Sequence, residues 1–448
     1  MSAQFSNLRR ISATVFASSA VLALAAFGAE AAEKPTFTKD IAPIFQEKCE
    51  ACHRPDSIAP MSLKSYAEAR PWLRAIRTQV SEHTMPPWNI HQTVGVTKFK
   101  NDRSLSEAQI QTILAWIDAG APQGDQKDMP APRTWPDDQG WNFAALFGQK
   151  EPDMIVKSYE FTMPAVSQDA WDKRVTPSGI TEPRWVRAVE IRPTTLKGRK
   201  ITHHAIAYLE QEEPGGGGAG LFGGGLPAPF MEWAIGKQGE LMRPDTGKLL
   251  LPGSKFHWDI HYSQAGEEIT SQVEMGIYFY PKGQEPKYRT TLSLVPAALG
   301  TLDIRPNTVS IAEGFTVLRD NARIESFQPH MHLRGKAMMV EAIQPSGMKQ
   351  VLSMVSNFNF NWMTTYVYAD DAAPLLPKGT ILKVTAWHDN TSAKKSNPDP
   401  SQWVGWGDRT VDEMAHAWIN IVYMKDEDYK AELEKRKAIP SQTSQPQQ

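Results

Sequence analysis

The sequence contains two cysteines, and both belong to the pentapeptide Cys49-Glu50-Ala51-Cys52-His53. This C-x-x-C-H pattern is typical of covalent c-type haem attachment, in which both thiols bond the haem and the histidine binds its iron. A C-x-x-C disulfide or redox pair is the alternative, because such pairs also occur in exported proteins. The adjacent histidine favours one covalently bound haem. With both cysteines used in this way, the rest of the 448-residue chain has to fold without disulfide bonds.

Length and composition limit the kind of protein that this chain can be. A chain of 448 residues is long enough for about three domains. Its hydrophobic content of 41% and charged content of 22% are typical of a soluble globular protein. The 48 Lys and Arg residues nearly balance the 50 Asp and Glu residues. The charge therefore indicates neither a nucleic-acid partner nor a membrane surface.

The N-terminus has the three parts of a secretory signal. Arg9 and Arg10 form a basic region, residues 11–27 an apolar region, and Ala29-Glu30-Ala31 a small-residue cleavage site. A retained membrane anchor is the alternative, but the apolar run is short and rich in Ala and Ser. We therefore predict a signal peptide over residues 1–31, export to the bacterial periplasm or its equivalent, and no membrane span after cleavage.

Two predicted helices bracket the C-x-x-C-H motif. The first covers residues 39–48 and runs directly into the motif, with apolar residues on one face. The second begins at a capping box formed by Ser106 and Gln109, and Gly120 ends it. Residues 33–125 are therefore predicted to form a small all-α haem domain. This part of the chain resembles the class I cytochrome c family.

The second axial ligand of the haem iron is less constrained by the sequence. Met85 lies in the proline-bounded loop Thr84-Met85-Pro86-Pro87-Trp88. We predict Met85 as the ligand, because its loop lies farther from the motif and can reach the opposite face of the haem. Met61 is a rival, and His83 or His91 would instead give ligation by two histidines. Core packing is the alternative role for either methionine.

Beyond this predicted domain the residue pattern changes twice. Residues 126–151 carry several prolines, aspartates and lysines without apolar periodicity, and we predict a linker there. Short apolar or alternating runs then follow, broken by Gly, Pro and Asp, as in antiparallel β-sandwiches. We predict one sandwich over residues 152–299 and a second over 300–428. A charged tail, in part helical and in part disordered, is predicted over 429–448.

The histidines outside the haem motif fall into compact settings. His330 and His332 form an H-x-H pair, and in a strand both side chains share a face with Cα atoms about 6.6 Å apart. Met414 could complete a site with them through a soft thioether, which favours Cu(I) over zinc. The adjacent His203 and His204 point to opposite faces of a regular strand, so their joint binding of one ion requires a bulge or strong twist.

Three further histidines have open roles. His257 shares a strand face with His261, but the two lie about 13 Å apart in an extended strand. His416 shares a face with Met414 and is either a rival ligand or a supporting neighbour. His388 has no clear role. Histidines of a β-sandwich core or surface remain the alternative for the whole set.

Several blocks of this sequence resemble the copper type II ascorbate-dependent monooxygenases, the family of dopamine β-monooxygenase and peptidylglycine α-hydroxylating monooxygenase. Their order and spacing match across roughly residues 155–425. The blocks are His203-His204, Trp233 to Gly239, Leu251-Pro252-Gly253, His261-Tyr262, His330 to Gly335 and Glu413-Met414. The resemblance implies two jelly-roll-like β-sandwich domains with one copper each. The expected fold class is thus a small all-α cytochrome c domain followed by two all-β sandwich domains.

Carried over by position, the resemblance also implies the copper ligands. An electron-transfer copper would be held by His203, His204 and His261, and an oxygen-activating copper by His330, His332 and Met414. Animal members are rich in disulfides, which this chain cannot form. Residues known to contact peptide or phenethylamine substrates have no match here. The substrate therefore stays open.

The predicted function is that of an exported copper-dependent monooxygenase. It would hydroxylate a C–H bond of a small organic substrate with O₂, and its electrons would reach the copper sites through the fused haem. An external one-electron donor, either a redox protein or a small reductant, would reload the haem. A non-catalytic haem and copper protein for electron transfer or copper handling is the alternative. A zinc hydrolase is disfavoured by Met414 and leaves the haem without a task.

Overall fold

The computed structural model describes residues 34–55, 57, 59–135, 140–213, 227–234, 237 and 239–438. The predicted signal peptide and the last ten residues of the predicted tail lie outside these described residues. All elements below belong to one unit of the chain, which starts at Pro35. Within the described residues, no helix combines the length and the apolar character that crossing a membrane requires.

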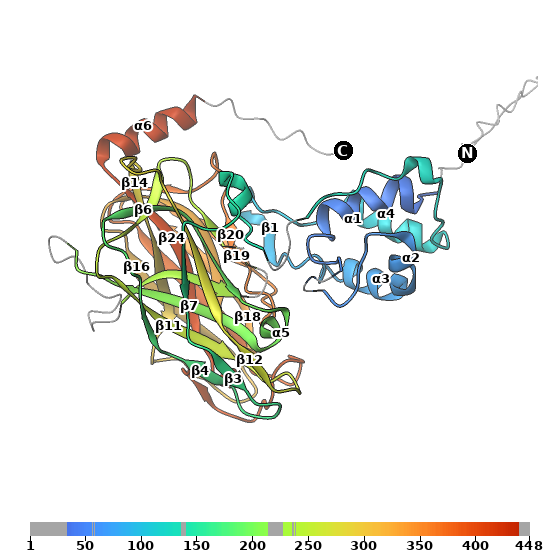
Figure 1. Ribbon diagram of the computed structural model, residues 1–448. Coiled ribbons are helices and arrows are strands. Elements are labelled where there is room, and N and C mark those ends of the chain that lie inside the picture. Colours follow the sequence, from blue (N-terminus) through green and yellow to red (C-terminus); the bar gives the residue numbers. More distant parts are fainter. Residues whose placement is uncertain are drawn as a thin grey trace, which may run out of the picture. The chain divides into compact units, whose positions relative to one another are not determined.

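The helices near the haem motif lie close together (Figure 1). Aromatic residues form part of the core that they share. The elements are a π-turn Phe37–Ile41, α1 Ala42–Lys48, α2 Tyr66–Ala69, a 3₁₀ turn Arg70–Trp72, α3 Leu73–Ser81 and α4 Glu107–Asp118. The predicted capping box at the start of α4 is confirmed: Gln109 N donates to Ser106 Oγ at 3.2 Å, and Ser106 N donates to Gln109 Oε1 at 2.9 Å. Phe45 and Trp116 meet edge to face with centroids 6.4 Å apart, so α1 and α4 share one small core.

The middle of this segment is not helical. β1, Ile90–Gly95, pairs antiparallel with β19, Lys349–Val355, near the other end of the chain. Gly95 adopts a φ of +76°, and a Cβ at this position would lie 2.5 Å from the carbonyl oxygen of Leu352. Ile90 is buried in the same core as β19. Because part of residues 33–125 completes a sheet of the C-terminal half, the expectation of an all-α cytochrome c domain is wrong.

The largest sheet joins the two halves of the β region. Its ten strands in spatial order start with β2 Met154–Lys157, β13 Val273–Phe279, β6 Arg184–Pro193 and β10 Thr246–Leu250. They continue with β14 Tyr288–Ala298, β24 Ala415–Met424, β17 Asn321–His330 and β20 Tyr366–Val367, while β9 Glu240–Leu241 pairs with β6 and β21 Leu375–Leu376 with β17. β14 pairs antiparallel with β24, so this sheet crosses the boundary that we predicted near residue 300. Two separate all-β sandwich domains are therefore also a wrong fold class: the described chain is one predominantly β structure with a shared sheet.

Two five-stranded sheets accompany the shared sheet. One comprises β4 Ala170–Asp172, β11 Lys255–Tyr262, β7 Thr202–Glu210 and β8 Ala228–Ala234, with β5 Val175–Pro177 paired to β11. The other has the order β1, β19, β18 Gly335–Ile343, β22 Ile381–Asp389 and β16 Val309–Val317. Small sheets pair β3 Phe161–Met163 with β12 Ile269–Ser271, and β15 Asp303–Ile304 with β23 Val404–Gly405. The remaining helices are α5 Leu196–Ile201 and α6 Asp426–Lys437, with 3₁₀ turns at Gln126–Asp128 and Ala144–Phe147.

Burial explains why the shared sheet is continuous. Every residue of β17 is buried, and β24 is buried at nine of its ten positions. Each half has its own apolar core, and Ile206, Leu292 and Trp418 form a smaller cluster that bridges them. Burial of a large apolar side chain contributes about 1.5–3 kcal/mol. The strands that carry the histidines thus run through rigid, well-packed regions.

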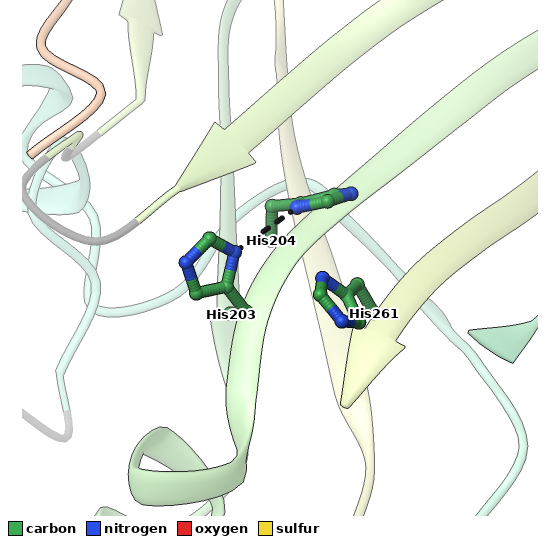
Figure 2. A group of neighbouring side chains, drawn as sticks. All are labelled: His203, His204 and His261. Carbon is green, nitrogen blue, oxygen red and sulfur yellow. Dashed lines mark hydrogen bonds between the residues drawn. The ribbon is translucent and has the colours of Figure 1, made fainter. Parts of the chain in front are cut away.

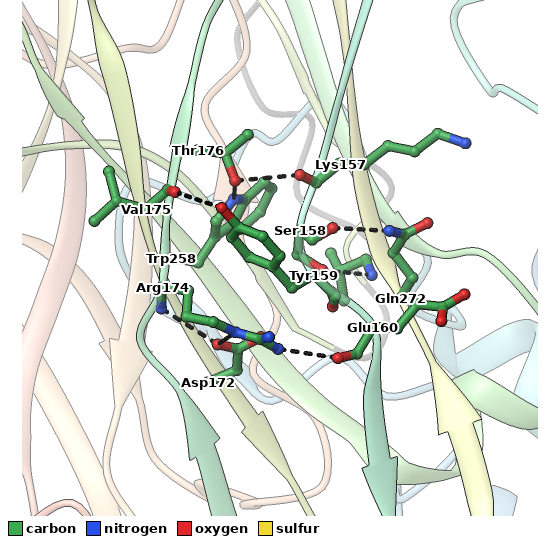
Figure 3. A network of polar contacts seen from close by, with 11 residues as sticks. Lys157, Ser158, Tyr159, Glu160, Asp172, Arg174, Val175, Thr176, Trp258 and Gln272 are labelled. Carbon is green, nitrogen blue, oxygen red and sulfur yellow. Dashed lines mark hydrogen bonds and ion pairs between the residues drawn. The ribbon is translucent and has the colours of Figure 1, made fainter.

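A polar network ties β11 to neighbouring strands (Figure 3). Trp258 Nε1 on β11 donates to Thr176 Oγ1 at 3.1 Å, and that hydroxyl donates to the Lys157 carbonyl at 3.2 Å. Arg174 forms an ion pair with Asp172 at 2.7 Å. The contacts of Thr176 join β2 and β5 to β11, the strand that carries His261.

Candidate metal centre and haem site

His203, His204 and His261 form the first histidine group. His203 and His204 stand at the start of β7, and His261 stands near the end of β11. In the antiparallel pairing of these strands, His261 lies opposite His204 and Tyr262 lies opposite Thr202. His203 is therefore an extra residue without a partner position, which is a β-bulge. The prediction that this adjacent pair needs a bulge to face one site is confirmed.

The bulge brings the three imidazoles together (Figure 2). One ligand nitrogen from each histidine lies within 4.8 Å of the other two. The Nδ1 atoms of His203 and His204 are 3.3 Å apart. In the described part of the chain, no other set of three His, Cys, Asp or Glu side chains gathers its ligand atoms so closely. Three converging imidazoles suit copper or zinc.

Residues of β4 and its neighbourhood support His261. Trp171 lies opposite His261 in the β4–β11 pairing and stacks on its ring, with centroids 4.7 Å apart and planes 4° from parallel. Asp169 Oδ2 lies 3.1 Å from His261 Nε2 and accepts a hydrogen bond from Thr410 Oγ1 at 2.6 Å. The contact with His261 holds the pKa of Asp169 down, at about 2. Asp169 therefore places a permanent negative charge beside the group.

His330, His332 and His416 form the second histidine group. His330 is the last residue of β17 and lies opposite His416 in the β17–β24 pairing. The two rings stack with centroids 4.4 Å apart and planes 18° from parallel. His332 follows two residues after His330, and their ring centroids are 5.6 Å apart. The structure thus brings together the predicted H-x-H pair and one of the histidines whose role the sequence left open.

Backbone contacts orient His332 and the predicted ligand Met414. His332 Nδ1 donates to the Asp412 carbonyl at 3.2 Å, which leaves Nε2 for a metal. Glu413 accepts hydrogen bonds from the backbone of His332 at 2.8 Å and of Arg334 at 2.5 Å. Burial raises the pKa of Glu413 to about 8. Met414 comes next and is half-buried, just before β24 rather than within it.

His388 and His257, the other two histidines of the β region, lie outside both groups. His388 Nε2 donates to the Met414 carbonyl at 3.1 Å and lies 3.5 Å from Glu413 Oε2. It therefore holds the backbone of a predicted ligand. His257 stands at the other end of β11, partly exposed, 2.5 Å from a carboxylate oxygen of Glu210. Neither belongs to a histidine group.

Burial keeps five of the grouped imidazoles neutral. It lowers the pKa of His203 to about 3, of His332 to about 4 and of His416 to about 3, and it places the pKa values of His204 and His330 well below the ordinary range. Neutral imidazole is the form that binds metals. Among the described residues, Nδ1 of His330 and both ring nitrogens of His416 are buried without a hydrogen-bond partner. Each such group costs about 1–3 kcal/mol, which a bound ion would recover.

The two groups are contiguous. The rings of His204 and His330 meet edge to face with centroids 5.8 Å apart. Phe360 stacks on His203 at 4.4 Å and meets the edge of His332 at 5.9 Å, so it contacts both groups. Sequence reasoning missed Phe360, Trp171 and Asp169. No local pattern marks these residues, because their place in the site follows from strand and loop contacts distant in sequence.

The haem motif has the side chains that covalent attachment requires. Cys49 and Cys52 form no disulfide bond and are half-buried, just after α1. His53 Nδ1 lies 3.3 Å from the Met61 carbonyl and 3.1 Å from Met61 Sδ. A haem-binding histidine uses Nε2 for iron when Nδ1 is held by the protein. Met61 therefore lies on the side of His53 that would face away from a bound iron, which argues against it as the second axial ligand.

The other axial candidates stay open as predictions. Met85 is half-buried, in a turn where its backbone N–H donates to the Gln79 carbonyl at 3.2 Å. His83 is exposed at the end of α3, with a φ of +54°. His91 lies in β1 and accepts a hydrogen bond from the Thr93 backbone at 3.3 Å. Met85 remains our prediction among these three.

Comparison with known proteins adds no family. No protein-family model matches the chain, and no curated protein matches it significantly. Among solved structures, the chain is similar to the major capsid protein P2 of bacteriophage PM2, with 10% identity and a TM-score of 0.24 over 61% of this chain and 99% of that one. It is also similar to the VP2 subviral particle of infectious bursal disease virus (11% identity, TM-score 0.17, 65% and 79% covered) and to dimeric latent PorU from Porphyromonas gingivalis (10%, 0.14, 58% and 25%). TM-scores this low support no conclusion about fold or function.

Proposed function

We propose that this protein is an exported copper-dependent monooxygenase that hydroxylates a C–H bond of a small organic substrate. The observation that carries the proposal is the contiguity of the two histidine groups, whose buried, neutral imidazoles include nitrogens without partners. Buried polar groups of this kind are rarely left unsatisfied in a purely structural core. The order of the ligand blocks along the chain supports copper as the metal and oxygen insertion as the reaction.

Each group would hold one copper. The first would be bound by His203, His204 and His261, and the second by His330, His332 and Met414. Copper in such sites supplies one-electron redox chemistry and the activation of O₂. The thioether of Met414 favours the reduced ion, and the hydrogen bond from His332 to the Asp412 carbonyl keeps Nε2 turned to the site.

Neighbouring residues would keep this chemistry dry and connected. Trp171 covers His261, and Phe360 covers His203 and contacts His332, so aromatic surface replaces water beside both groups. The edge-to-face contact of His204 with His330 joins a ligand of one ion to a ligand of the other. One electron held at the first group therefore has a short protein path to the second.

The covalent haem at Cys49, Cys52 and His53 would deliver the electrons. A haem carries one electron at a time, as copper does, and attachment to the same chain raises its effective concentration at the β region. An external redox protein or small reductant would reload the haem. Covalent haem attachment also agrees with export to the periplasm, which the N-terminal sequence predicts.

The decisive experiment compares two methionine variants of the haem-loaded, copper-loaded protein. Met414→Ala should lower O₂ uptake by at least about 100-fold. Loss of a residue that binds the metal should lower activity at least as much as loss of a neighbour that only orients the ligands. Met348→Ala is the matched control: Met348 is 52% exposed, and uptake should not change. In the wild type, reduced anaerobically and then mixed with O₂ and substrate, the haem should oxidise within one turnover.

Each contrary result has a distinct meaning. Zinc at the histidine groups, or unchanged uptake in Met414→Ala, would contradict the monooxygenase. Copper binding without any O₂ consumption would instead support electron transfer or copper handling. A haem that stays reduced during turnover would exclude it as the direct donor.

A further inference from the structure

The pairing of β17 with β24 places two potential ligands side by side on one face of the shared sheet. His330 lies directly opposite His416 in this antiparallel pair. Opposite residues of such a pair share a face. His332 follows just after β17 ends, and Met414 directly precedes β24. The H-x-H sequence at the end of β17 thus meets the M-x-H sequence at the start of β24, and the four residues lie at the same end of the two strands.

His416 is the one of these four residues that the ligand prediction leaves out, and its surroundings do not explain why a histidine stands there. Its side chain is buried, and both ring nitrogens lack a hydrogen-bond partner within the described structure. Its neighbours are the ring of His330, stacked at 4.4 Å, and the ring of Trp418, edge to face at 5.1 Å. A neutral imidazole offers one donor and one acceptor, so packing alone would be served better by an apolar side chain.

We propose that His416 is a fourth protein ligand of the copper held by His330, His332 and Met414. This proposal rests on the proposed function. An imidazole binds a metal in the plane of its ring, so two stacked rings do not aim at the same ion. His416 therefore turns about its side-chain bonds when copper binds, and its strand position opposite His330 keeps it within reach.

The other nearby histidines do not compete for this role. His388 Nε2 already donates a hydrogen bond to the Met414 carbonyl. His204 contacts the ring of His330, but its own group already gathers three ligand atoms. Of these three histidines, only His416 has two ring nitrogens without a partner and stands directly opposite His330.

The test uses two substitutions at position 416 in the haem-loaded full chain. His416→Leu is apolar and cannot bind copper, whereas His416→Met keeps a ligand atom that is suited to Cu(I). Cu(I) is titrated against a competing chelator, and the copper-to-protein ratio and the affinity of each ion are read out. His257→Leu, at the partly exposed end of β11, controls for the loss of a histidine elsewhere.

A ligand role predicts that His416→Leu weakens one of the two coppers by about 100-fold or more, while His416→Met stays within about tenfold of the wild type. If His416 only positions other residues or packs against them, both variants should lose copper affinity equally. If His416 has no role, neither variant should lose copper affinity. Either result overturns the proposal. Wild-type protein that binds two coppers and consumes O₂, together with an unchanged His416→Leu, would refute this inference alone. Wild-type protein without copper would refute it together with the proposed function.

Discussion

The two histidine groups differ in how their backbone assembles them. In the first group, a bulge in β7 already aims three imidazoles at one point, with ligand atoms within 4.8 Å of one another. In the second group, the strands place the residues in register, but the rings of His330 and His416 still stack on each other. The first group is thus preorganised, whereas the second must rearrange. A rigid site suits an ion that only passes electrons, and an adaptable site suits an ion whose coordination changes during the reaction.

The largest effect that would test this comparison is the difference between His332→Ala and His261→Ala. Both variants should lose one of two coppers. His332→Ala should lower O₂ uptake by at least about 100-fold even in a single turnover, because it removes a ligand of the reacting ion. His261→Ala should still consume O₂ in the first part of a single turnover, but it should fail to consume O₂ in the steady state. Copper analysis with rapid-mixing O₂ consumption measures both, and identical kinetics of the two variants would end the distinction.

A second, smaller effect concerns the ties between the halves that carry the groups. Gln328, two residues before His330, donates to Glu232 of β8 at 2.8 Å, and Lys237 connects Glu232 to Glu240. Lys248 lies 2.6 Å from Glu240. All of these side chains are buried. Glu240→Gln should therefore destabilise the fold by about 3 kcal/mol, because it leaves buried ammonium groups without their counter-ion.

The pKa of Glu240 determines the direction in which this contribution to stability changes with pH. Burial works to raise the pKa of Glu240, but Lys248 and Lys237 outweigh it and lower the pKa to about 2, below the ordinary 4.5. Between these values the unfolded chain binds the extra proton, so this contribution to stability is complete above pH 4.5 and is lost as the pH falls towards 2. Urea unfolding from pH 7 to 3 should show a shallower loss in Glu240→Gln than in the wild type. Parallel curves would contradict the charged state.

The smallest expected effect concerns Phe360, the residue that contacts both groups. Phe360→Leu removes the ring that stacks on His203, an interaction worth about 0.5–1.5 kcal/mol. Both coppers should still bind, and O₂ uptake should fall about threefold to tenfold. Copper stoichiometry and uptake measured on one sample are sufficient. The loss of either copper would show that Phe360 does more than cover the site.

Local signals in the sequence predicted local structure well. The capping box at Ser106 depends on residues three apart, and it is present. Strand geometry required a bulge at His203, and the pairing contains one. The H-x-H spacing of His330 and His332 placed two rings together. In each case the controlling interactions lie within a few residues or within one strand.

The features that the sequence did not predict depend on pairing between strands that lie far apart in the chain. Six residues from Ile90 form a strand whose partner lies about 260 positions later, and nothing in their own pattern separates them from the surrounding helices. The antiparallel pairing of β14 with β24 joins the two predicted domains in one sheet. Trp171 reaches His261 because β4 pairs with β11. Such contacts depend on which strands meet, and composition and periodicity do not specify this.

The position of β1 limits which parts of this protein can be removed, permuted or exchanged. β1 comes from the middle of the segment that is predicted to carry the haem, and it covers one edge of a sheet whose other strands span residues 309–389. A fragment that started at residue 152 would expose the backbone edge of β19 and uncover part of the apolar core. Open sheet edges of this kind favour aggregation. Truncation, circular permutation or exchange of the haem-bearing part would therefore have to preserve or replace those six residues.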